Sequence, residues 1–219
     1  MYNTKGAIFD LDGVIVDTAK FHYLAWRKLA NELGFDITEI QNEQLKGVSR
    51  VRSLEKILEW GGVTLTQDQF MEQMAIKNDN YLSYISTMTS KDILPGVKKV
   101  IDFLIENEVP IALGSASKNA RSILEKTGLF QSFDVVVDGN DVSKAKPDPE
   151  VFLIAAQELG IVPENCIVFE DSQAGIEAAN NAGMISIGIG DSKVLNEGDH
   201  IFEDFTKIEI DFIKAILKE

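Results

Sequence analysis

The sequence predicts an α/β protein: a parallel-sheet core with an all-helical insertion after its first strand. From about residue 94 onward, short apolar runs alternate with segments whose apolar residues recur at helical spacing. That alternation is typical of a parallel sheet covered by helices. Between about residues 18 and 88, every periodic segment is helical. We therefore expect a core made of residues 1–16 and 90–219, and a helical domain made of residues 17–89.

The first strand is the apolar run Ala7–Phe9, which leads into Asp10-Leu11-Asp12-Gly13. Asp10 and Asp12 are two residues apart, so on a regular strand their carboxylates share one face and repel each other. A bound cation or a shared proton would relieve that repulsion. Gly13 allows the backbone to turn sharply directly afterwards. Taken alone, this quartet fits an acidic turn after a core strand as well as it fits a catalytic site.

The insertion contains several helix signals. Apolar residues at helical spacing run from Phe21 to Leu33 and stop at Gly34. A second helix face ends at Gly61-Gly62, since glycine commonly follows a helix. Two Thr-x-x-Gln sequences are typical of capping boxes at helix starts, namely Thr38 with Gln41 and Thr66 with Gln69. The second of these opens a longer helix that extends to about Ile85.

The core then continues as alternating helices and strands. Further strands are predicted at Ile111–Gly114, Phe133–Val137, Cys166–Phe169, Met184–Ile189 and His200–Phe202. Helices are predicted after Pro95-Gly96, after Ser117, from Pro149 to Leu159, from Ala174 to Ala182, and near the C-terminus. Strands connected through helices in this way lie parallel in one sheet, so that their carboxyl ends lie at the same edge of it.

Composition limits the class of protein. The 219 residues carry a net charge of −14 and a single cysteine, Cys166, inside an apolar run. A strongly acidic chain argues against nucleic acid or an anionic membrane as partner. A lone cysteine argues for a reducing compartment, and no segment resembles a signal peptide or a membrane span. We expect a monomeric cytoplasmic protein that binds small molecules, with a locally cationic site for any anionic substrate.

Polar residues of useful chemistry follow the predicted strands. Asp10 and Asp12 follow the first strand, Ser115 follows the second, Lys146 lies in a loop, and Glu170-Asp171 ends the fourth. Carboxylates gathered at one edge require a divalent cation, and an oxygen-only ligand set favours Mg²⁺. A hydroxyl and a lysine suit a phosphoryl group bound beside the metal.

Each of these residues also has an ordinary structural interpretation. Ser115 would serve as a helix cap, Lys146 as a solvated loop lysine, and Glu170-Asp171 as an acidic pair at a helix N-terminus. The combination, in this order and at these strand ends, favours a site over three unrelated structural roles.

The set Asp10-Leu11-Asp12-Gly13, Ser115, Lys146-Pro147 and Glu170-Asp171 resembles the four motifs of the haloacid dehalogenase superfamily. The resemblance implies a Rossmann-like core, with Asp10 as the nucleophile that accepts a phosphoryl group and Asp12 as general acid and base. It also implies Mg²⁺ bound by Asp10, the backbone carbonyl of Asp12, Glu170 and Asp171. The helical insertion corresponds to the mobile cap of that superfamily.

Further segments resemble one branch of the superfamily, the enzymes that interconvert β-glucose 1-phosphate and glucose 6-phosphate through β-glucose 1,6-bisphosphate. These segments are His22 with Trp26, Leu45–Arg50, Lys77–Tyr81 and Gly114–Asn119. The chain departs from that branch at Val51-Arg52, where acidic residues are expected, and after Ile189. A Mg²⁺-dependent sugar-phosphate phosphatase on the same scaffold is the alternative. A regulatory protein with a degenerate site is disfavoured, because the motif residues are all present.

The same resemblance suggests which residues bind substrate. Arg50 is the candidate for the second phosphate, because a guanidinium binds phosphate oxygens in pairs, and His22 is the candidate to orient Asp12 or a sugar hydroxyl. The remaining phosphate- or sugar-binding candidates are Gly47, Lys77, Ser115, Ala116, Ser117, Lys118, Asn119 and Lys146. The alternatives are a helix-surface position for Arg50, a solvated Lys77, a surface position for His22 and an N-cap role for Ser117. Trp26 is expected to be buried in the hydrophobic interior.

Overall fold

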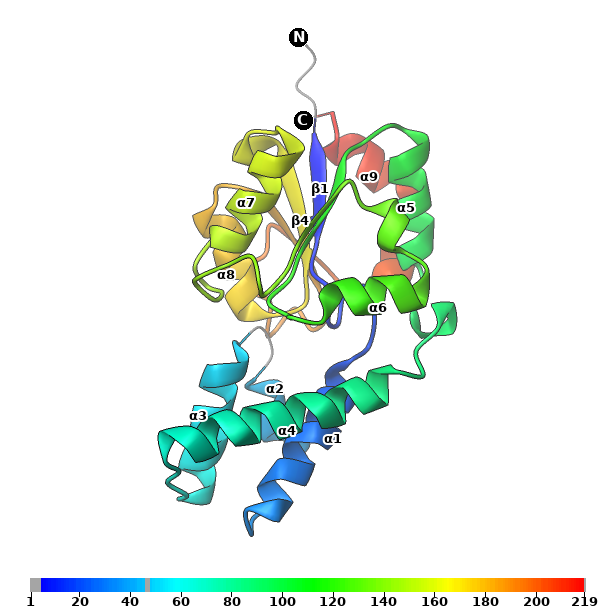
Figure 1. Ribbon diagram of the computed structural model, residues 1–219. Helices are drawn as coiled ribbons and strands as arrows, with labels where there is room; N and C mark the ends of the chain where they lie inside the picture. The colour runs from blue at the N-terminus through cyan, green and yellow to red at the C-terminus, as the bar shows by residue number, and fades with distance from the viewer. Residues whose placement is uncertain (1–4, 46–47, 219) are drawn as a thin grey trace. The chain divides into compact units, whose positions relative to one another are not determined.

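The computed structural model describes residues 5–45 and 48–218, and its elements are drawn in Figure 1. The chain divides into two compact units, Met1–Asp17 with Thr89–Glu219 and Thr18–Met88. We call the first unit the core and the second unit the cap. The boundaries expected from the sequence differ from these by one residue at each junction.

The core contains a six-stranded sheet in the order β3-β2-β1-β4-β5-β6, with every neighbouring pair parallel. This is the strand order of a doubly wound, Rossmann-like sheet. The predicted fold class is therefore confirmed. The strands are β1 Gly6–Phe9, β2 Ile111–Gly114, β3 Val135–Val137, β4 Cys166–Glu170, β5 Ile185–Ile189 and β6 His200–Phe202.

Helices cover both faces of this sheet (Figure 1). One face carries α5 (Val97–Glu106), α6 (Ala120–Thr127) and α9 (Ile210–Ile216). The other carries α7 (Glu150–Leu159) and α8 (Gln173–Asn181), whose apolar side chains pack on the strand residues that point toward them. Short 3₁₀ turns lie at Ser90–Asp92, Phe130–Ser132, Pro163–Asn165 and Phe205–Lys207.

Successive residues of β1 point to opposite faces, which explains how a short strand anchors both layers. Ile8 is fully buried in the cluster that includes Phe152 of α7. Phe9 points the other way and stacks on Phe169, with ring centroids 4.6 Å apart, and lies 6.2 Å from the ring of Phe205. β1 is thus held on both faces, and its last residue occupies a fixed position.

The strand register places the ends of β1, β2 and β4 side by side. Phe9 pairs with Leu113 on one side and with Phe169 on the other. The residues that come next in the chain, Asp10 and Glu170 among them, must therefore emerge at the same edge of the sheet.

The core also pairs the two chain segments that flank the insertion. Val16 and Ile93 form an antiparallel bridge. The Leu94 amide donates a hydrogen bond to the Ile15 carbonyl at 2.9 Å. The points where the chain leaves and re-enters the core are thus joined within the core.

The cap is helical, as predicted, with α1 Ala19–Glu32, α2 Glu39–Glu43, α3 Arg50–Gly61 and α4 Gln67–Ile85. Its buried cluster includes Trp26, Leu29, Leu54 and Ile57. Both predicted capping boxes are present, at Thr38 and at Thr66.

Two elements of the core begin two residues later than the sequence predicts. The helix expected directly after Ser117 begins only at Ala120, after a turn in which the Ser117 hydroxyl accepts a hydrogen bond from the Asn119 amide. The third strand begins at Val135 rather than Phe133. Just before this strand, the Asp134 carboxylate accepts a hydrogen bond from the Ile111 amide at 2.8 Å. A side chain thus takes the place of the backbone carbonyl that a neighbouring strand would offer to this amide.

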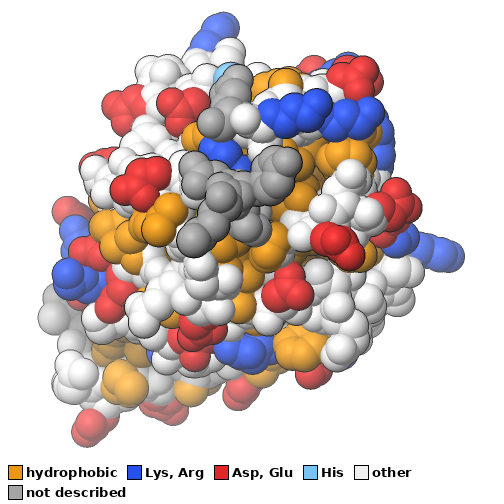
Figure 2. Space-filling view, turned by 90° about the horizontal axis from the view of Figure 1, so that it is seen from above, with side chains coloured by type: hydrophobic (Ala, Val, Ile, Leu, Met, Phe, Trp, Pro, Cys, Tyr) orange, Lys and Arg blue, Asp and Glu red, His pale blue; other side chains and the backbone are white. Residues whose placement is uncertain are grey.

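The surface mixes charge of both signs. On the face drawn in Figure 2, acidic side chains are scattered, with basic and apolar side chains between them. Within the described ranges, no helix combines the length and the apolar character that a membrane span requires.

Candidate active site

The Asp10 carboxylate is buried at the end of β1 and is held through both oxygens. Its Oδ2 accepts a hydrogen bond from the Asp12 amide at 3.0 Å, and its Oδ1 accepts one from Lys146 Nζ at 2.6 Å. The Asp10 amide donates to the Phe169 carbonyl at 2.9 Å, which continues the ladder between β1 and β4. The backbone and the side chain of Asp10 are therefore both fixed.

Lys146 is a buried cation rather than a solvated loop lysine, so that alternative is wrong. Its ammonium also contacts the Gly114 carbonyl at 3.2 Å and Glu170 Oε1 at 3.5 Å, and lies 4.6 Å from the ring centre of Phe152. Burial alone would lower the pKa of Lys146, but the carboxylates of Asp10 and Glu170 outweigh it and raise that pKa to about 12. Lys146 therefore stays protonated at neutral pH.

Glu170 is the last residue of β4, and Ser172, not Glu170 or Asp171, caps α8. The interpretation of Glu170-Asp171 as an acidic pair at a helix start is thus wrong. Glu170 Oε1 accepts from the Ser172 hydroxyl at 2.5 Å, and Oε2 accepts from the Asp171 amide at 3.1 Å. Burial raises the pKa of Glu170 to about 7, an effect that Lys146 opposes and Asp10 reinforces.

Two glycines make room for these carboxylates. Gly13 has a φ of +83°, and a Cβ placed on it would lie 2.0 Å from Asp171 Oδ2. A Cβ on Gly175 would lie 1.6 Å from Glu170 Oε1. Neither position accepts a side chain unless a carboxylate moves.

The carboxylates of Asp10, Glu170 and Asp171 offer oxygen atoms that all lie within 4.8 Å of one another. A set of hard oxygen donors this close fits a small divalent cation, and the excess negative charge of the cluster favours one. Asp12 is half-buried and meets Asp10 through its backbone amide. The residues present therefore fit a metal ion.

Residues 115–119 form a tight turn between β2 and α6. Ser115 is buried and donates its amide to the Val137 carbonyl at 3.0 Å, while its hydroxyl accepts from the Ser117 amide at 3.2 Å. Ser115 is therefore a turn residue at the end of β2, and its interpretation as a helix cap is wrong. Ala116, Ser117 and Asn119 are half-buried, and Lys118 is exposed.

Lys77 and His22 lie together inside the cap. Lys77 is only 2% exposed, and its Nζ lies 3.0 Å from His22 Nδ1. The ammonium also faces the rings of Trp26 and Tyr81, at 4.4 and 4.9 Å from their centres. The interpretation of Lys77 as a solvated lysine is therefore wrong. Trp26 is buried in the hydrophobic interior, as expected, here that of the cap, and it also contacts a cation.

The His22 ring is electrically neutral in this setting. Burial lowers its pKa well below 6.5, and the nearby charges of Lys77 and Arg50 lower it further. An ammonium has donors only, so His22 Nδ1 accepts from Lys77 and the ring proton sits on Nε2. His22 thus offers a hydrogen-bond donor from Nε2.

Arg50 is the first residue of α3, behind the Ser49 cap, and is half-buried. Gly47 lies outside the described residues. The departure at Val51-Arg52 falls on the outer side of the helix: Val51 is 46% exposed, and Arg52 forms an exposed ion pair with Glu55 at 2.8 Å. That departure therefore changes the surface of α3 rather than its buried side.

Comparison with known proteins identifies the family. The family model of haloacid dehalogenase-like hydrolases matches residues 4–183. The chain belongs to this family. It is 38% identical over 211 residues to the β-phosphoglucomutase of Bacillus subtilis, covering 95% of this chain and 93% of the relative. It is 30% identical over 201 residues to a phosphorylated carbohydrates phosphatase of Thermotoga maritima, covering 91% and 90%.

A solved structure extends the similarity to three dimensions. The crystal structure of a β-phosphoglucomutase from Clostridium difficile matches with a TM-score of 0.93 and 40% identity, covering 97% of this chain and 96% of that one. The family resemblance predicted from the sequence motifs is confirmed.

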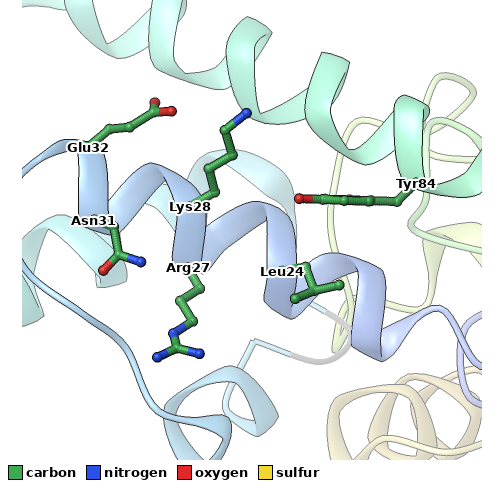
Figure 3. A pocket seen from close by; sticks show the side chains of 6 residues that line it. All are labelled: Leu24, Arg27, Lys28, Asn31, Glu32 and Tyr84. Carbon is green, nitrogen blue, oxygen red and sulfur yellow. The ribbon is translucent and has the colours of Figure 1, made fainter.

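Beyond the family motifs, the cap has a groove of about 470 Å³ between α1 and α4, shown in Figure 3. In that view Lys28 extends toward α4, and Arg27 points to the other side of α1. Arg27 is bound through two hydrogen bonds to Asp36, and Lys28 donates to Asn80 at 2.7 Å. Both cations are already engaged, and the groove includes none of the residues predicted for the site.

The sequence alone did not indicate every residue that builds the site. Ser172 holds Glu170 and caps α8 at once, since its hydroxyl also accepts from the Gly175 amide at 3.1 Å. The sequence did contain a signal for Ser172, because a serine just before a predicted helix is a typical N-cap. Tyr81 was included in the resembling segment Lys77–Tyr81 without a role, although its spacing of four residues from Lys77 on a predicted helix already placed the two side chains side by side.

Proposed function

We propose that this protein is a β-phosphoglucomutase, which interconverts β-D-glucose 1-phosphate and D-glucose 6-phosphate through an aspartyl phosphate and β-glucose 1,6-bisphosphate. The observation that carries the proposal is the buried Asp10 carboxylate, ion-paired to Lys146 at 2.6 Å beside two further carboxylates. The names of the Bacillus subtilis and Clostridium difficile relatives support the substrate.

Asp10 acts as the nucleophile in this proposal. A carboxylate oxygen attacks the phosphorus, the bond from phosphorus to the sugar oxygen breaks, and the phosphoryl group is left on Asp10. Lys146 compensates negative charge on the nucleophile and on the phosphoryl oxygens. Its buried, protonated state suits that role, because an ammonium that is already desolvated interacts strongly with an anion.

Mg²⁺ would be held by Asp10, the Asp12 backbone carbonyl, Glu170 and Asp171, and when bound it would neutralise charge on the transferred group. Asp12 serves as general acid and base: it gives a proton to the departing sugar oxygen and takes one from the incoming hydroxyl. The amide of Asp12 is fixed by Asp10 Oδ2 at 3.0 Å, which holds the Asp12 backbone next to the nucleophile.

The remaining predicted residues bind the sugar phosphate. Ser115, Ala116, Ser117, Lys118 and Asn119 form the loop beside Lys146, while Gly47, Arg50, Lys77 and His22 belong to the cap. A mutase must protect phosphorylated Asp10 from water until a sugar phosphate accepts the phosphoryl group, and it must keep the resulting bisphosphate bound while that molecule reorients above the free Asp10 carboxylate. A cap that carries cations for the second phosphate and excludes water serves that requirement.

The alternative is a Mg²⁺-dependent sugar-phosphate phosphatase, which the name of the Thermotoga maritima relative favours. The two functions share the nucleophile and differ in the acceptor, a sugar hydroxyl or water. A monomeric state, a cytoplasmic location and the absence of nucleic-acid partners stay predictions.

Product analysis tests the proposal. With Mg²⁺, β-glucose 1-phosphate and a trace of β-glucose 1,6-bisphosphate, we expect glucose 6-phosphate with little inorganic phosphate. α-Glucose 1-phosphate, run in parallel, is expected to be a poor substrate. If the release of inorganic phosphate equals or exceeds the formation of glucose 6-phosphate, the mutase proposal is wrong and the phosphatase alternative takes its place.

A further inference from the structure

The loop after β3 lies directly against the loop after β2. The Gly139 amide donates to the Ser117 carbonyl at 3.2 Å, and Asn140 Nδ2 donates to the Lys118 carbonyl at 3.1 Å. Both acceptors belong to residues 115–119. We infer that Gly139 and Asn140 are positioning residues, which fix the backbone of this loop in the conformation that binds the sugar phosphate. The inference rests on the proposed function, because it assigns a task at the same site.

A buried carboxylate orients the Asn140 side chain. Asp138 is 1% exposed, and its Oδ1 accepts from both the amide and the side-chain Nδ2 of Asn140, each at 2.8 Å. Its Oδ2 accepts from Arg121 Nε at 3.1 Å, and Arg121 also donates to the Val136 carbonyl at 2.7 Å. One hydrogen of the Asn140 amide group is thus directed at Asp138, which leaves the other pointing at Lys118.

Gly139 contributes by having no side chain. A Cβ at this position would lie 2.3 Å from the Ala116 carbonyl oxygen and 3.1 Å from Lys118 Cγ. Gly139 is not among the residues with positive φ, so an added side chain is excluded by contact and not by backbone strain. The loop of residues 115–119 therefore rests on the backbone of Gly139 itself.

The hydrogen bonds from Gly139 and Asn140 reach only the second half of the loop, at Ser117 and Lys118. Ser115 is held separately, by the Val137 carbonyl, and the Gly114 carbonyl is held by Lys146. Changes at Gly139 or Asn140 should therefore affect the binding of the sugar phosphate through residues 117–119. They should spare the reaction of Asp10 with a small phosphoryl donor that does not reach those residues.

The first experiment compares Asn140→Ala and Asn140→Asp with Asn180→Ala. Asn180 is a matched control, because its Nδ2 donates to another loop carbonyl, that of Glu197, at 2.9 Å. Asn140→Ala removes the side-chain hydrogen bonds to the Lys118 carbonyl and to Asp138. Because only the bond to Lys118 reaches the loop of residues 115–119, the variant should raise KM for β-glucose 1-phosphate about two- to tenfold. Asn140→Asp should be worse, because it faces Asp138 with a second carboxylate. The rate of Asp10 phosphorylation by acetyl phosphate should be unchanged in all three variants.

The second experiment uses Gly139→Ala, with Gly198→Ala as control, since a Cβ on Gly198 would approach the His200 carbonyl oxygen only to 3.3 Å. Amide hydrogen exchange is measured without substrate, after circular dichroism has established that both variants fold. We expect faster exchange at the Ser117 and Asn119 amides in Gly139→Ala and in Asn140→Ala, and no change in either control.

Unchanged exchange and unchanged KM in the Gly139 and Asn140 variants would overturn the inference, as would equal effects in the control variants. Failure of the proposed function has a different signature. In that case the wild-type protein makes no glucose 6-phosphate, while the exchange data still report whether the two loops are coupled.

Discussion

The core and the cap both hold a lysine away from solvent, but they stabilise its charge by different means. In the core, Lys146 lies between two carboxylates, at 2.6 Å from Asp10 and 3.5 Å from Glu170. In the cap, Lys77 faces two aromatic rings and a neutral imidazole. An ion pair within the core compensates the charge of Lys146 before substrate arrives, whereas an aromatic ring attracts the ammonium of Lys77 through its π face and carries no formal charge. A buried lysine is thus accommodated in two different chemical environments, one ionic and one aromatic.

The largest expected effect comes from removing the nucleophile in the core. Asp10→Asn keeps the shape of the side chain but cannot accept the phosphoryl group, so turnover should fall by a factor of roughly 10³ or more, as for other nucleophile replacements. Asp134→Asn is the matched control, since its carboxylate accepts only a structural hydrogen bond from the Ile111 amide. The measurement is glucose 6-phosphate formation under saturating substrate. Activity within about tenfold of wild type would contradict covalent catalysis by Asp10.

An intermediate effect is expected from the cap. Arg50→Ala should weaken binding of β-glucose 1,6-bisphosphate by about 1.5–3 kcal/mol, the typical cost of losing a charged hydrogen bond. Phosphorylation of Asp10 by acetyl phosphate should change little, because that donor has no second phosphate. Arg52→Ala is the control, two residues further along α3 and exposed in its pair with Glu55. Equal losses with both ligands would place Arg50 outside the binding site and remove the contrast between the units.

The smallest expected effect is a pH dependence of cap stability. The pKa of His22 is lowered in the folded cap, whereas an unfolded histidine titrates near 6.5. As the pH falls below about 6.5, the unfolded chain binds a proton that the folded cap excludes, so stability is present above that pH and is lost below it. One proton contributes at most about 1.4 kcal/mol per pH unit to this slope.

His22→Gln should flatten the slope between about pH 6.5 and 5, and His200→Gln, a change of the chain's other histidine in the core, should not. The free energy of unfolding is measured by urea titration and tryptophan fluorescence. This signal reports on the cap, because both tryptophans, Trp26 and Trp60, lie there. A slope that persists in His22→Gln would mean that other groups of the cap govern it.

Much of this architecture could be predicted from local patterns. The apolar run before Asp10, the two capping boxes and the glycine after α3 each specify an element through nearby residues alone. The core site was predictable for a different reason, because parallel strands bring their carboxyl ends to one edge of the sheet whatever lies between them in the chain.

What the sequence concealed depends on contacts between distant residues. Lys77 was predicted as a substrate-binding candidate with a solvated lysine as the alternative, and neither interpretation included its burial by Trp26 and His22 of α1, 51 and 55 positions earlier in the chain. The contact of Asn140 with Lys118 likewise arises only when β2 and β3 pair.

The bridge between Val16 and Ile93, with the hydrogen bond from Leu94 to Ile15, has an evolutionary consequence. Because the core itself joins the two ends of the inserted segment, it sets the spacing that any insert must span but not the insert's length or sequence. Residues 18–88 can therefore diverge or be exchanged as a cassette while the strand edge that carries Asp10 stays unaltered. A family that diversifies in this way changes selectivity at one insertion point of the chain and keeps the same nucleophile.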